Sequence, residues 1–289
     1  MTLASPGLRG CDRLEYQGPF PDGDGPLPWI GYVGSMTPDP ILDHPIISER
    51  YFFPRDTPLP NAVMVEVPGA KLACWRSAPP TDRPVLLHFH GNGEVVADWA
   101  GQLTGAVQRM GFEVFYGEYR GYGASTGTPM LGAMLDDVPA IVEAVGVPPE
   151  QIVVFGRSVG SIYAIEAIHR FPSMRGLVLE SGIHDVLERL ALRLHPDELG
   201  CTAAELQHAV SRRLDHGMKL GGYTGPCLVL HAEQDHLVGV HHAIANHRAV
   251  ASKTKRLVRF PRGDHNSIMG ANMESYMTEL ARFLAAVGS

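Results

Sequence analysis

The sequence lacks any run of about 18 apolar residues, which is the length that a membrane-spanning helix needs. Its N-terminal sequence, Met-Thr-Leu-Ala-Ser-Pro-Gly-Leu-Arg-Gly, lacks the apolar core of a signal peptide. Both absences lead us to expect a cytoplasmic protein without an integral membrane segment. Positive charge is not in excess either, because 24 Lys and Arg residues stand against 31 Asp and Glu residues, and we therefore expect no nucleic-acid partner.

Cysteine motifs are lacking as well. The four cysteines are far apart and form no C-x-x-C pair, so the sequence indicates neither a zinc motif nor a redox motif, and we expect buried, reduced thiols. A metal site from His88, His90 and His231 is conceivable, but no metalloprotease spacing occurs. We therefore expect no metal and no other cofactor. The cysteines are Cys11, Cys74, Cys201 and Cys227.

The composition is that of a globular protein, and the first 60 residues differ from the rest. The chain of 289 residues is 45% hydrophobic and 19% charged, which is compatible with one domain that carries insertions. Residues 1–60 hold 11 of the 23 prolines, together with aromatic residues such as Trp29 and Tyr51 that favour burial. We predict an irregular N-terminal arm over residues 1–60, wrapped on a main domain over residues 61–289.

The main domain shows a regular alternation of patterns. A hairpin over residues 62–76 is followed by six apolar runs that alternate with helical patterns. This alternation predicts an α/β fold with a mostly parallel central sheet and helices on both faces, in which functional groups lie just past the carboxyl ends of the strands. The predicted strands are 85–89, 113–116, 152–155, 176–179, 227–230 and 256–260, and the predicted helices lie near 95–110, 131–145, 160–171, 240–250 and 273–287.

The third apolar run leads directly into Gly-Arg-Ser-Val-Gly at residues 156–160, and an apolar helical pattern follows. A G-x-S-x-G motif between strand and helix is typical of a sharp turn that presents a serine hydroxyl above the sheet edge. The same pattern occurs at residues 123–127, but Ser125 follows a polar stretch that indicates a loop. We therefore predict Ser158 as a nucleophile and Ser125 as a loop residue.

A nucleophilic serine needs a base, and the base needs a carboxylate. The last two apolar runs are followed by Asp235 and His265, respectively. A histidine can take the serine proton, and a carboxylate fixes the tautomer of the imidazole ring. Glu233 and Asp185 remain alternatives for the acid, whereas Asp264 adjoins His265 too closely to orient it and is predicted to be a turn residue.

Five motifs follow one another along the chain: His-Gly-Asn-Gly-Glu at 90–94, Tyr-Arg-Gly-Tyr-Gly-Ala-Ser at 119–125, Gly-Arg-Ser-Val-Gly at 156–160, Gln-Asp-His-Leu-Val at 234–238 and Gly-Asp-His-Asn at 263–266. Together they resemble the α/β-hydrolase superfamily, and within it the monoacylglycerol-lipase-like and lysophospholipase-like serine hydrolases. The resemblance covers about residues 60–288 and implies an α/β-hydrolase fold. It also implies Ser158 as nucleophile, Asp235 as acid and His265 as base, with the backbone amides of Asn92 and Val159 as the oxyanion hole.

Residues 183–225 separate two predicted strands by more than one ordinary crossover. Apolar residues repeat there at helical spacing, which fits a crossover helix packed on the sheet or a small helical cap over the site. As a cap, this insertion would line a substrate pocket with Leu190, Leu194 and Leu206. We predict a small cap over about residues 183–225.

These features predict a serine hydrolase that cleaves carboxylic esters through an acyl-enzyme. The small cap favours short to medium acyl chains, and the resemblance keeps monoacylglycerol and lysophospholipid among the candidate substrates. A thioesterase, or an amidase or peptidase, would use the same residues, and a non-catalytic binding protein of the same fold is the alternative from another class. We expect a small-molecule ester as partner, and the sequence leaves the oligomeric state open.

Overall fold

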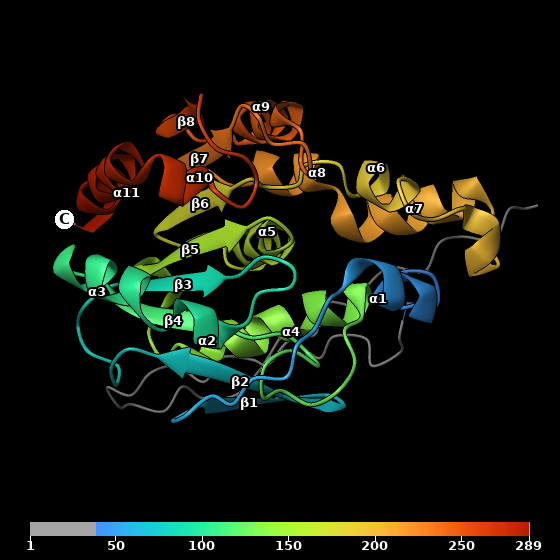
Figure 1. Ribbon diagram of the computed structural model, residues 1–289, viewed down its shortest axis with the longest axis horizontal. Helices are drawn as coiled ribbons and strands as arrows, with labels where there is room; N and C mark the ends of the chain where they lie inside the picture. Colours follow the sequence, from blue (N-terminus) through green and yellow to red (C-terminus); the bar gives the residue numbers. More distant parts are fainter. Residues whose placement is uncertain (1–38, 289) are drawn as a thin grey trace, which may run out of the picture. The chain divides into compact units, whose positions relative to one another are not determined.

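The computed structural model describes residues 39–288 of the chain. They form an eight-stranded sheet in the order β1-β2-β4-β3-β5-β6-β7-β8, in which the strands from β3 to β8 run parallel (Figure 1). Every predicted strand is present, which confirms the predicted mostly parallel α/β fold. The strands are β1 (Val63–Val67), β2 (Ala70–Arg76), β3 (Val85–Phe89), β4 (Glu113–Gly117), β5 (Ile152–Arg157), β6 (Gly176–Glu180), β7 (Cys227–Ala232) and β8 (Lys255–Phe260).

The helices follow the predicted alternation, with the first predicted stretch divided into two short helices. None of the helices between residues 39 and 288 has the length and apolar character needed to cross a membrane. The helices on the sheet are α2 (Val96–Trp99), α3 (Gln102–Arg109), α4 (Leu131–Ala144), α5 (Gly160–Arg170), α9 (Val240–Ala249), α10 (Ile268–Ala271) and α11 (Met273–Gly288).

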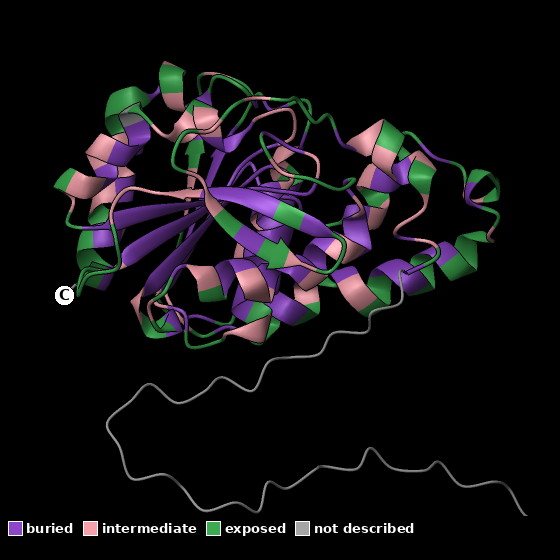
Figure 2. Cartoon of the chain, turned by 90° about the horizontal axis from the view of Figure 1, so that it is seen from below, coloured by how far each residue is buried: buried purple, intermediate pink, exposed green. Residues whose placement is uncertain are grey.

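The core consists of one hydrophobic cluster on each face of the sheet. Successive side chains of a strand point to opposite faces, so Ile152 and Val154 of β5 enter one cluster while Val153 and Phe155 enter the other. The first cluster includes residues of α4 and α5, and the second includes residues of α3 and α11. Figure 2 shows the consequence: the central strands are buried, whereas the helices have a buried side and an exposed side.

The chain between β6 and β7 forms a group of short helices. They are α6 (Val186–Ala191), the 3₁₀ helix η2 (Pro196–Leu199), α7 (Ala203–Leu214) and α8 (His216–Gly221). The start of α7 is fixed by a capping box, in which the side chains of Thr202 and Glu205 each accept a hydrogen bond from the other's amide. Figure 1 shows α6 and α7 on the side toward which the arrows of β3 and β5 point, which is where the carboxyl ends of the strands lie.

The predicted N-terminal arm is described from residue 39 onward, and residues 1–38 lie outside the described residues. The described part contains the helix α1 (Pro45–Tyr51). Just before it, the Asp43 carboxylate accepts hydrogen bonds from the amides of Gly132 and Ala133 at 2.7 and 2.9 Å. These bonds satisfy free amides in the first turn of α4 and attach this part of the arm to the domain.

The three cysteines in the described range are free thiols. Cys74 and Cys227 are buried in strands, and burial raises the pKa of both thiols to about 12. Cys201 is half-buried, and Cys11 lies outside the described residues. The two strand cysteines are therefore protonated at neutral pH and act as small apolar side chains.

Candidate active site

Ser158 lies in a sharp turn between β5 and α5. Its backbone φ is 53°, in the left-handed region that residues with a Cβ rarely adopt. A Cβ on Gly156 would lie 2.6 Å from the Ser161 Cα, and a Cβ on Gly160 would lie 2.1 Å from the Phe89 carbonyl oxygen. The two glycines of the motif are therefore required by close backbone contacts, and these contacts hold the Ser158 hydroxyl at the carboxyl end of β5.

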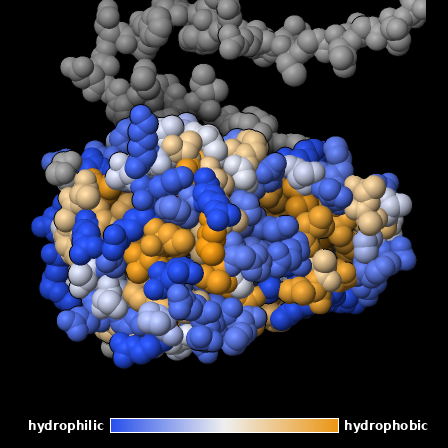
Figure 3. All heavy atoms as spheres, turned by 90° about the horizontal axis from the view of Figure 1, so that it is seen from above, coloured by the Kyte–Doolittle hydropathy of each residue, from blue (hydrophilic) through white to orange (hydrophobic). Residues whose placement is uncertain are grey.

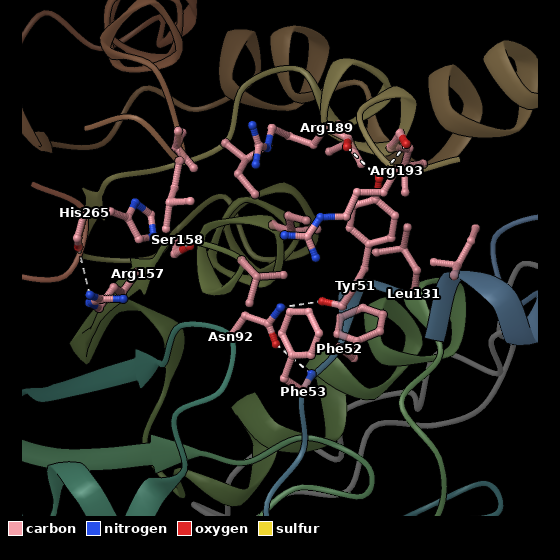
Figure 4. Close-up of a pocket in the computed structure, with 18 of the residues that line it drawn as sticks. Tyr51, Phe52, Phe53, Asn92, Leu131, Arg157, Ser158, Arg189, Arg193 and His265 are labelled. Carbon is pink, nitrogen blue, oxygen red and sulfur yellow. Dashed lines mark hydrogen bonds between the residues drawn. The ribbon is translucent and has the colours of Figure 1, made fainter. Parts of the chain in front are cut away.

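Three side chains from separate strand ends form one hydrogen-bonded chain. The Ser158 hydroxyl lies 2.8 Å from His265 Nε2, and His265 Nδ1 lies 2.7 Å from Asp235 Oδ2. Because an ionised carboxylate can only accept, His265 Nδ1 carries the proton and donates to Asp235. The other ring nitrogen, Nε2, is then free to accept the proton of the Ser158 hydroxyl. All three side chains are buried, and Figure 4 shows Ser158 and His265 close together.

The Asp235 carboxylate is fixed by its own loop. Its Oδ1 accepts hydrogen bonds from the amides of Leu237 and Val238 at 2.9 and 2.8 Å. Burial alone would raise the pKa of Asp235, but the hydrogen bond from His265 and the backbone donors outweigh it and hold the pKa below its usual range. The carboxylate is therefore ionised at neutral pH and oriented toward His265.

The other residues that the sequence left open lie in different settings. Glu233 is exposed and pairs with an arginine on β8 at 3.7 Å. Asp185 caps α6, and Asp264 accepts hydrogen bonds from two amides of its own turn. The Ser125 hydroxyl accepts a hydrogen bond from the Ala73 amide on β2. Of the three carboxylates considered as partners of His265, only Asp235 contacts its ring within the described residues.

The loop after β3 is held by a buried charge pair. His90 Nε2 lies 2.6 Å from a Glu118 oxygen, and His90 Nδ1 lies 2.8 Å from the Gly91 carbonyl oxygen, so both ring nitrogens donate. Burial lowers the pKa of His90, but the Glu118 carboxylate outweighs burial and the net shift is upward. Glu118 also accepts hydrogen bonds from the amides of Val96 and Tyr119. The loop therefore has few other conformations available.

Asn92 and Val159 both line the space next to Ser158. Within residues 39–288 neither backbone amide has a hydrogen-bond acceptor, so both remain free donors. The Asn92 side chain has a different function. It donates to the Tyr51 carbonyl, and its oxygen accepts from the Phe53 amide at 3.0 Å and from the Tyr122 hydroxyl at 2.7 Å. Asn92 thus connects the loop after β3 to the chain that follows α1.

Arg157, the residue before Ser158, is the centre of a second buried network. Its guanidinium forms ion pairs with Glu94 at 2.8 Å and Glu180 at 3.0 Å, and it donates to the His265 carbonyl oxygen at 3.0 Å. Burial lowers the pKa of Arg157, but the two carboxylates outweigh it and raise the pKa overall. One side chain therefore connects β5, β6, the loop after β3 and the loop that carries His265. The role of Arg157 could not be predicted from the sequence, because the residue at this motif position varies.

A cavity of about 280 Å³ lies next to Ser158. In Figure 4, Ser158 and His265 lie on one side of it and Tyr51, Phe52 and Phe53 lie on the other. Its walls come from α1 and the residues after it, from the segment around α6, and from the loops after β3, β7 and β8. The lining residues are Ile47, Tyr51, Phe52, Phe53, Asn92, Leu131, Arg157, Ser158, Val159, Ile162, Ile183, Val186, Arg189, Leu190, Arg193, Leu237, Val238, His265 and Asn266.

Of the three leucines predicted to line this pocket, Leu190 does so, whereas Leu194 and Leu206 do not. Both of these side chains are buried in the hydrophobic cluster instead. The helical spacing suggested one continuous face, but α6 ends at Ala191, before Leu194, and Leu206 belongs to α7. Aromatic residues from the N-terminal arm supply the apolar wall in their place, and their signal in the sequence was only a preference for burial.

The arm and the segment around α6 are bonded directly to each other at the cavity. The Tyr51 hydroxyl donates to the carbonyls of Arg189 and Leu190. Arg50 pairs with Glu198 and donates to the Arg193 carbonyl at 2.7 Å, while Arg193 donates to the Arg50 carbonyl at 2.9 Å. Two parts of the cavity wall that are about 140 residues apart in the chain therefore support each other.

One group of three potential metal ligands occurs among the described residues, formed by Glu188, His241 and His242. The Glu188 carboxylate lies 3.2 Å from His241 Nε2 and 3.4 Å from His242 Nε2. However, His242 Nδ1 accepts hydrogen bonds from the amides of His184 and Asp185. The proton of the neutral ring is then on Nε2, where it blocks the lone pair that a metal would need. We interpret this group as a carboxylate hydrogen-bonded to His241, with the neutral His242 ring beside it.

The histidines that the sequence offered as conceivable metal ligands have separate surroundings. His88 packs against the rings of Trp99 and Phe155, His90 is paired with Glu118, and His231 bonds a backbone carbonyl. Within residues 39–288 they do not form a group of potential ligands.

The comparisons with known proteins agree with this fold. The family model described as "Serine aminopeptidase, S33" matches residues 80–219, which include Ser158 but end before Asp235 and His265. The esterase of Pyrococcus furiosus has a similar structure, with a TM-score of 0.64 at 15% identity over 83% of this chain and 99% of that one. The chain has the α/β-hydrolase fold, and the matched family model covers just under half of its length.

Two further proteins are similar to this chain in sequence. "Uncharacterized protein YfhR" of Escherichia coli (strain K12) is 27% identical over 214 residues, which is 68% of this chain and 70% of that protein. The human "Alpha/beta hydrolase domain-containing protein 17C" is 26% identical over 170 residues, or 57% of this chain. The match spans about half, 48%, of that human protein.

Proposed function

We propose that this protein is a serine hydrolase that cleaves carboxylic esters through an acyl-enzyme. The observation that carries the proposal is the hydrogen-bonded chain of Ser158, His265 and Asp235 beside a cavity with two free backbone amides. The α/β-hydrolase fold and the match to the serine aminopeptidase family model support it. A small-molecule ester is then the expected partner, and a cytoplasmic location remains part of the proposal.

In the proposed reaction, the Ser158 oxygen attacks the ester carbonyl while its proton moves to His265 Nε2. The carbonyl oxygen becomes an oxyanion that accepts hydrogen bonds from the amides of Asn92 and Val159, and losing one such donor costs about 10²–10³ in rate. His265 then gives its proton to the leaving alcohol, and the acyl group remains on Ser158. A water molecule, deprotonated by His265, releases the acid by the same steps in reverse. Asp235 stabilises the charged ring throughout.

We propose short to medium acyl chains as the preferred substrates. The cavity of about 280 Å³ is slightly smaller than the pockets of roughly 300–1,000 Å³ that hold drug-sized ligands. Each buried methylene contributes about 0.8 kcal/mol, so affinity should rise with chain length only until the cavity is full. On the face that Figure 3 shows, apolar patches are separated by hydrophilic residues, which does not favour adsorption on a lipid surface.

In this proposal, residues 183–225 form the small cap over the site. Residues 45–53 complete the wall of the cavity. A series of p-nitrophenyl esters from acetate to palmitate, with an emulsified triglyceride beside it, tests the chain length. We expect kcat/KM to reach its maximum at an intermediate length. A maximum at palmitate, with a further increase at the emulsion interface, would instead identify a lipase.

Covalent labelling tests the chemistry itself. Wild-type protein should react with a fluorophosphonate probe at Ser158, and Ser158→Ala should lose both the label and turnover while it stays folded. Labelling at Ser125 would contradict the proposal, and a complete lack of labelling and turnover would favour a non-catalytic binding protein. Matched thioester and amide substrates show whether a thioesterase, amidase or peptidase activity exceeds ester hydrolysis.

A further inference from the structure

The charged side chains among the described residues that line the cavity are all positive. Three arginines line it, and no Asp or Glu occurs among the described residues of its wall, although the whole chain has a net charge of -7. Arg157 is neutralised by Glu94 and Glu180 behind the site. The two remaining arginines, Arg189 and Arg193, have no such partner among the residues that the structure describes.

Arg193 is held in place by contacts other than a carboxylate of residues 39–288. Its guanidinium lies over the rings of Tyr51 and Phe53, with centroids 5.8 and 5.6 Å away, and it donates to the Arg50 carbonyl. A guanidinium has five donors, so most of them remain available. Arg189, four residues earlier on α6, forms no ion pair with a carboxylate of residues 39–288. Figure 4 shows both side chains reaching from the α6 segment toward the side where Ser158 lies.

We infer that Arg189 and Arg193 form an anion subsite, and that the substrate is a small ester that carries a carboxylate or a phosphate group. Guanidinium groups bind both anions through charge-assisted hydrogen bonds, which are roughly twice as strong as neutral ones. With the ester carbonyl at Ser158, the anionic group would lie toward α6. The inference rests on the proposed ester hydrolysis for the position of the carbonyl, and it goes beyond that proposal in assigning a charge to the substrate.

Matched substrate pairs test the inference and separate the two anions. The carboxylate pair is p-nitrophenyl hydrogen adipate against p-nitrophenyl hexanoate, and the phosphate pair is 1-butyrylglycerol 3-phosphate against 1-butyrylglycerol. We expect the charged member of at least one pair to have a kcat/KM at least about tenfold higher, which corresponds to about 1.4 kcal/mol. Neutral substrates that match or exceed their charged partners in both pairs would overturn the inference.

Variants show whether the arginines cause the preference. Arg189→Met keeps an unbranched side chain without the guanidinium group and leaves the contacts of Arg193 with the arm intact, while Arg193→Lys keeps the charge without the planar donor set. We expect the preference to fall severalfold in Arg189→Met and to approach one in the double variant Arg189→Met/Arg193→Met. Arg248→Met removes a charge from exposed α9, away from the cavity, and should leave the preference unchanged. A preference that persists in the double variant, or falls equally in Arg248→Met, would contradict the assignment.

Binding to an inactive protein separates this inference from the proposed function. Ser158→Ala can be titrated by calorimetry with intact 1-butyrylglycerol 3-phosphate and 1-butyrylglycerol, and with adipate monomethyl ester and methyl hexanoate. At least one anionic ligand should bind about tenfold more tightly than its neutral partner, and Arg189→Met should reduce that ratio. Equal affinities in both pairs would overturn the anion subsite even if wild-type protein hydrolyses esters. An absence of fluorophosphonate labelling and of turnover would contradict only the hydrolase proposal.

Discussion

Single residues determine whether His265 keeps the tautomer that a base requires. The Asp235 carboxylate accepts a hydrogen bond from the Nδ1–H of His265 and is held by two backbone amides. In Asp235→Asn the side-chain amide can donate to Nδ1, which favours the proton on Nε2 and removes the acceptor for Ser158. We expect kcat to fall by about 10⁴ while the free energy of unfolding changes little. Steady-state kinetics beside urea unfolding checks this, and Glu233→Gln is the matched control that should retain activity.

Arg157 gives a second prediction for one residue. Removal of its charge would leave the buried Glu180 carboxylate and the half-buried Glu94 carboxylate without their cationic partner, at a cost of about 3–5 kcal/mol. Arg157→Lys keeps the charge but cannot reach both carboxylates and the His265 carbonyl at once. We expect this variant to fold, with a kcat lowered by roughly tenfold or more and a smaller change in KM, since the loop of His265 loses a donor. Wild-type kcat in Arg157→Lys would show that the hydrogen bond to His265 has no effect on positioning.

At the scale of the elements, the side chain of Asn92 joins the N-terminal arm to the loop after β3. Asn92→Ala keeps the backbone amide but removes the bonds to Tyr51, Phe53 and Tyr122. A fully buried group left without a partner costs about 1–3 kcal/mol, and the groups here are only partly buried, so we expect a smaller loss of stability together with a decrease in kcat/KM. Tyr122→Phe removes one of these bonds and the bond from the Phe53 amide to the Tyr122 hydroxyl, but it keeps the Asn92 bonds to the arm and should have a smaller effect on both quantities. Urea unfolding and ester hydrolysis measure them, and equal effects of the two variants would contradict a role for the arm contacts.

The sequence predicts some of these elements and their positions, but not all of them. The positions of Ser158, Asp235 and His265 could be predicted, because parallel strands bring their carboxyl ends to one edge whatever the loops do. The wall of the cavity could not be predicted. It depends on contacts such as the one between Tyr51 and Leu190, which are 139 residues apart, and local periodicity carries no information on such contacts. The helical spacing of apolar residues also continues through Leu194, although α6 ends before that residue.

For the whole molecule, buried histidines predict how stability depends on pH. Burial lowers the pKa of His216 to about 3 and that of His242 to about 4, and it also lowers the pKa of His88 and His231. The unfolded chain binds protons at these residues below about pH 6.5, whereas the folded protein does not. The free energy of unfolding should therefore fall as the pH decreases from about 6.5 to 4, by up to about 1.4 kcal/mol per pH unit for each such residue.

His90 has the opposite effect, because its pKa is raised in the folded protein, but it is one residue against four. Urea unfolding at pH 7, 6 and 5 should show a steadily decreasing midpoint. His216→Gln should reduce the slope, since this variant has one fewer group that gains a proton on unfolding. A midpoint that is constant or rises toward pH 5 would contradict the prediction.

The left-handed backbone conformation at Ser158 lowers the stability of the fold at a position whose hydroxyl the proposed reaction needs. A residue with a Cβ costs about 1–2 kcal/mol in this conformation, and glycine avoids that cost. Ser158→Gly should therefore unfold at a higher denaturant concentration than Ser158→Ala, although both variants lack the hydroxyl. An engineering campaign that selects this protein for thermal tolerance alone would consequently favour glycine at position 158, and an activity screen has to accompany it if the Ser158 hydroxyl is to be retained.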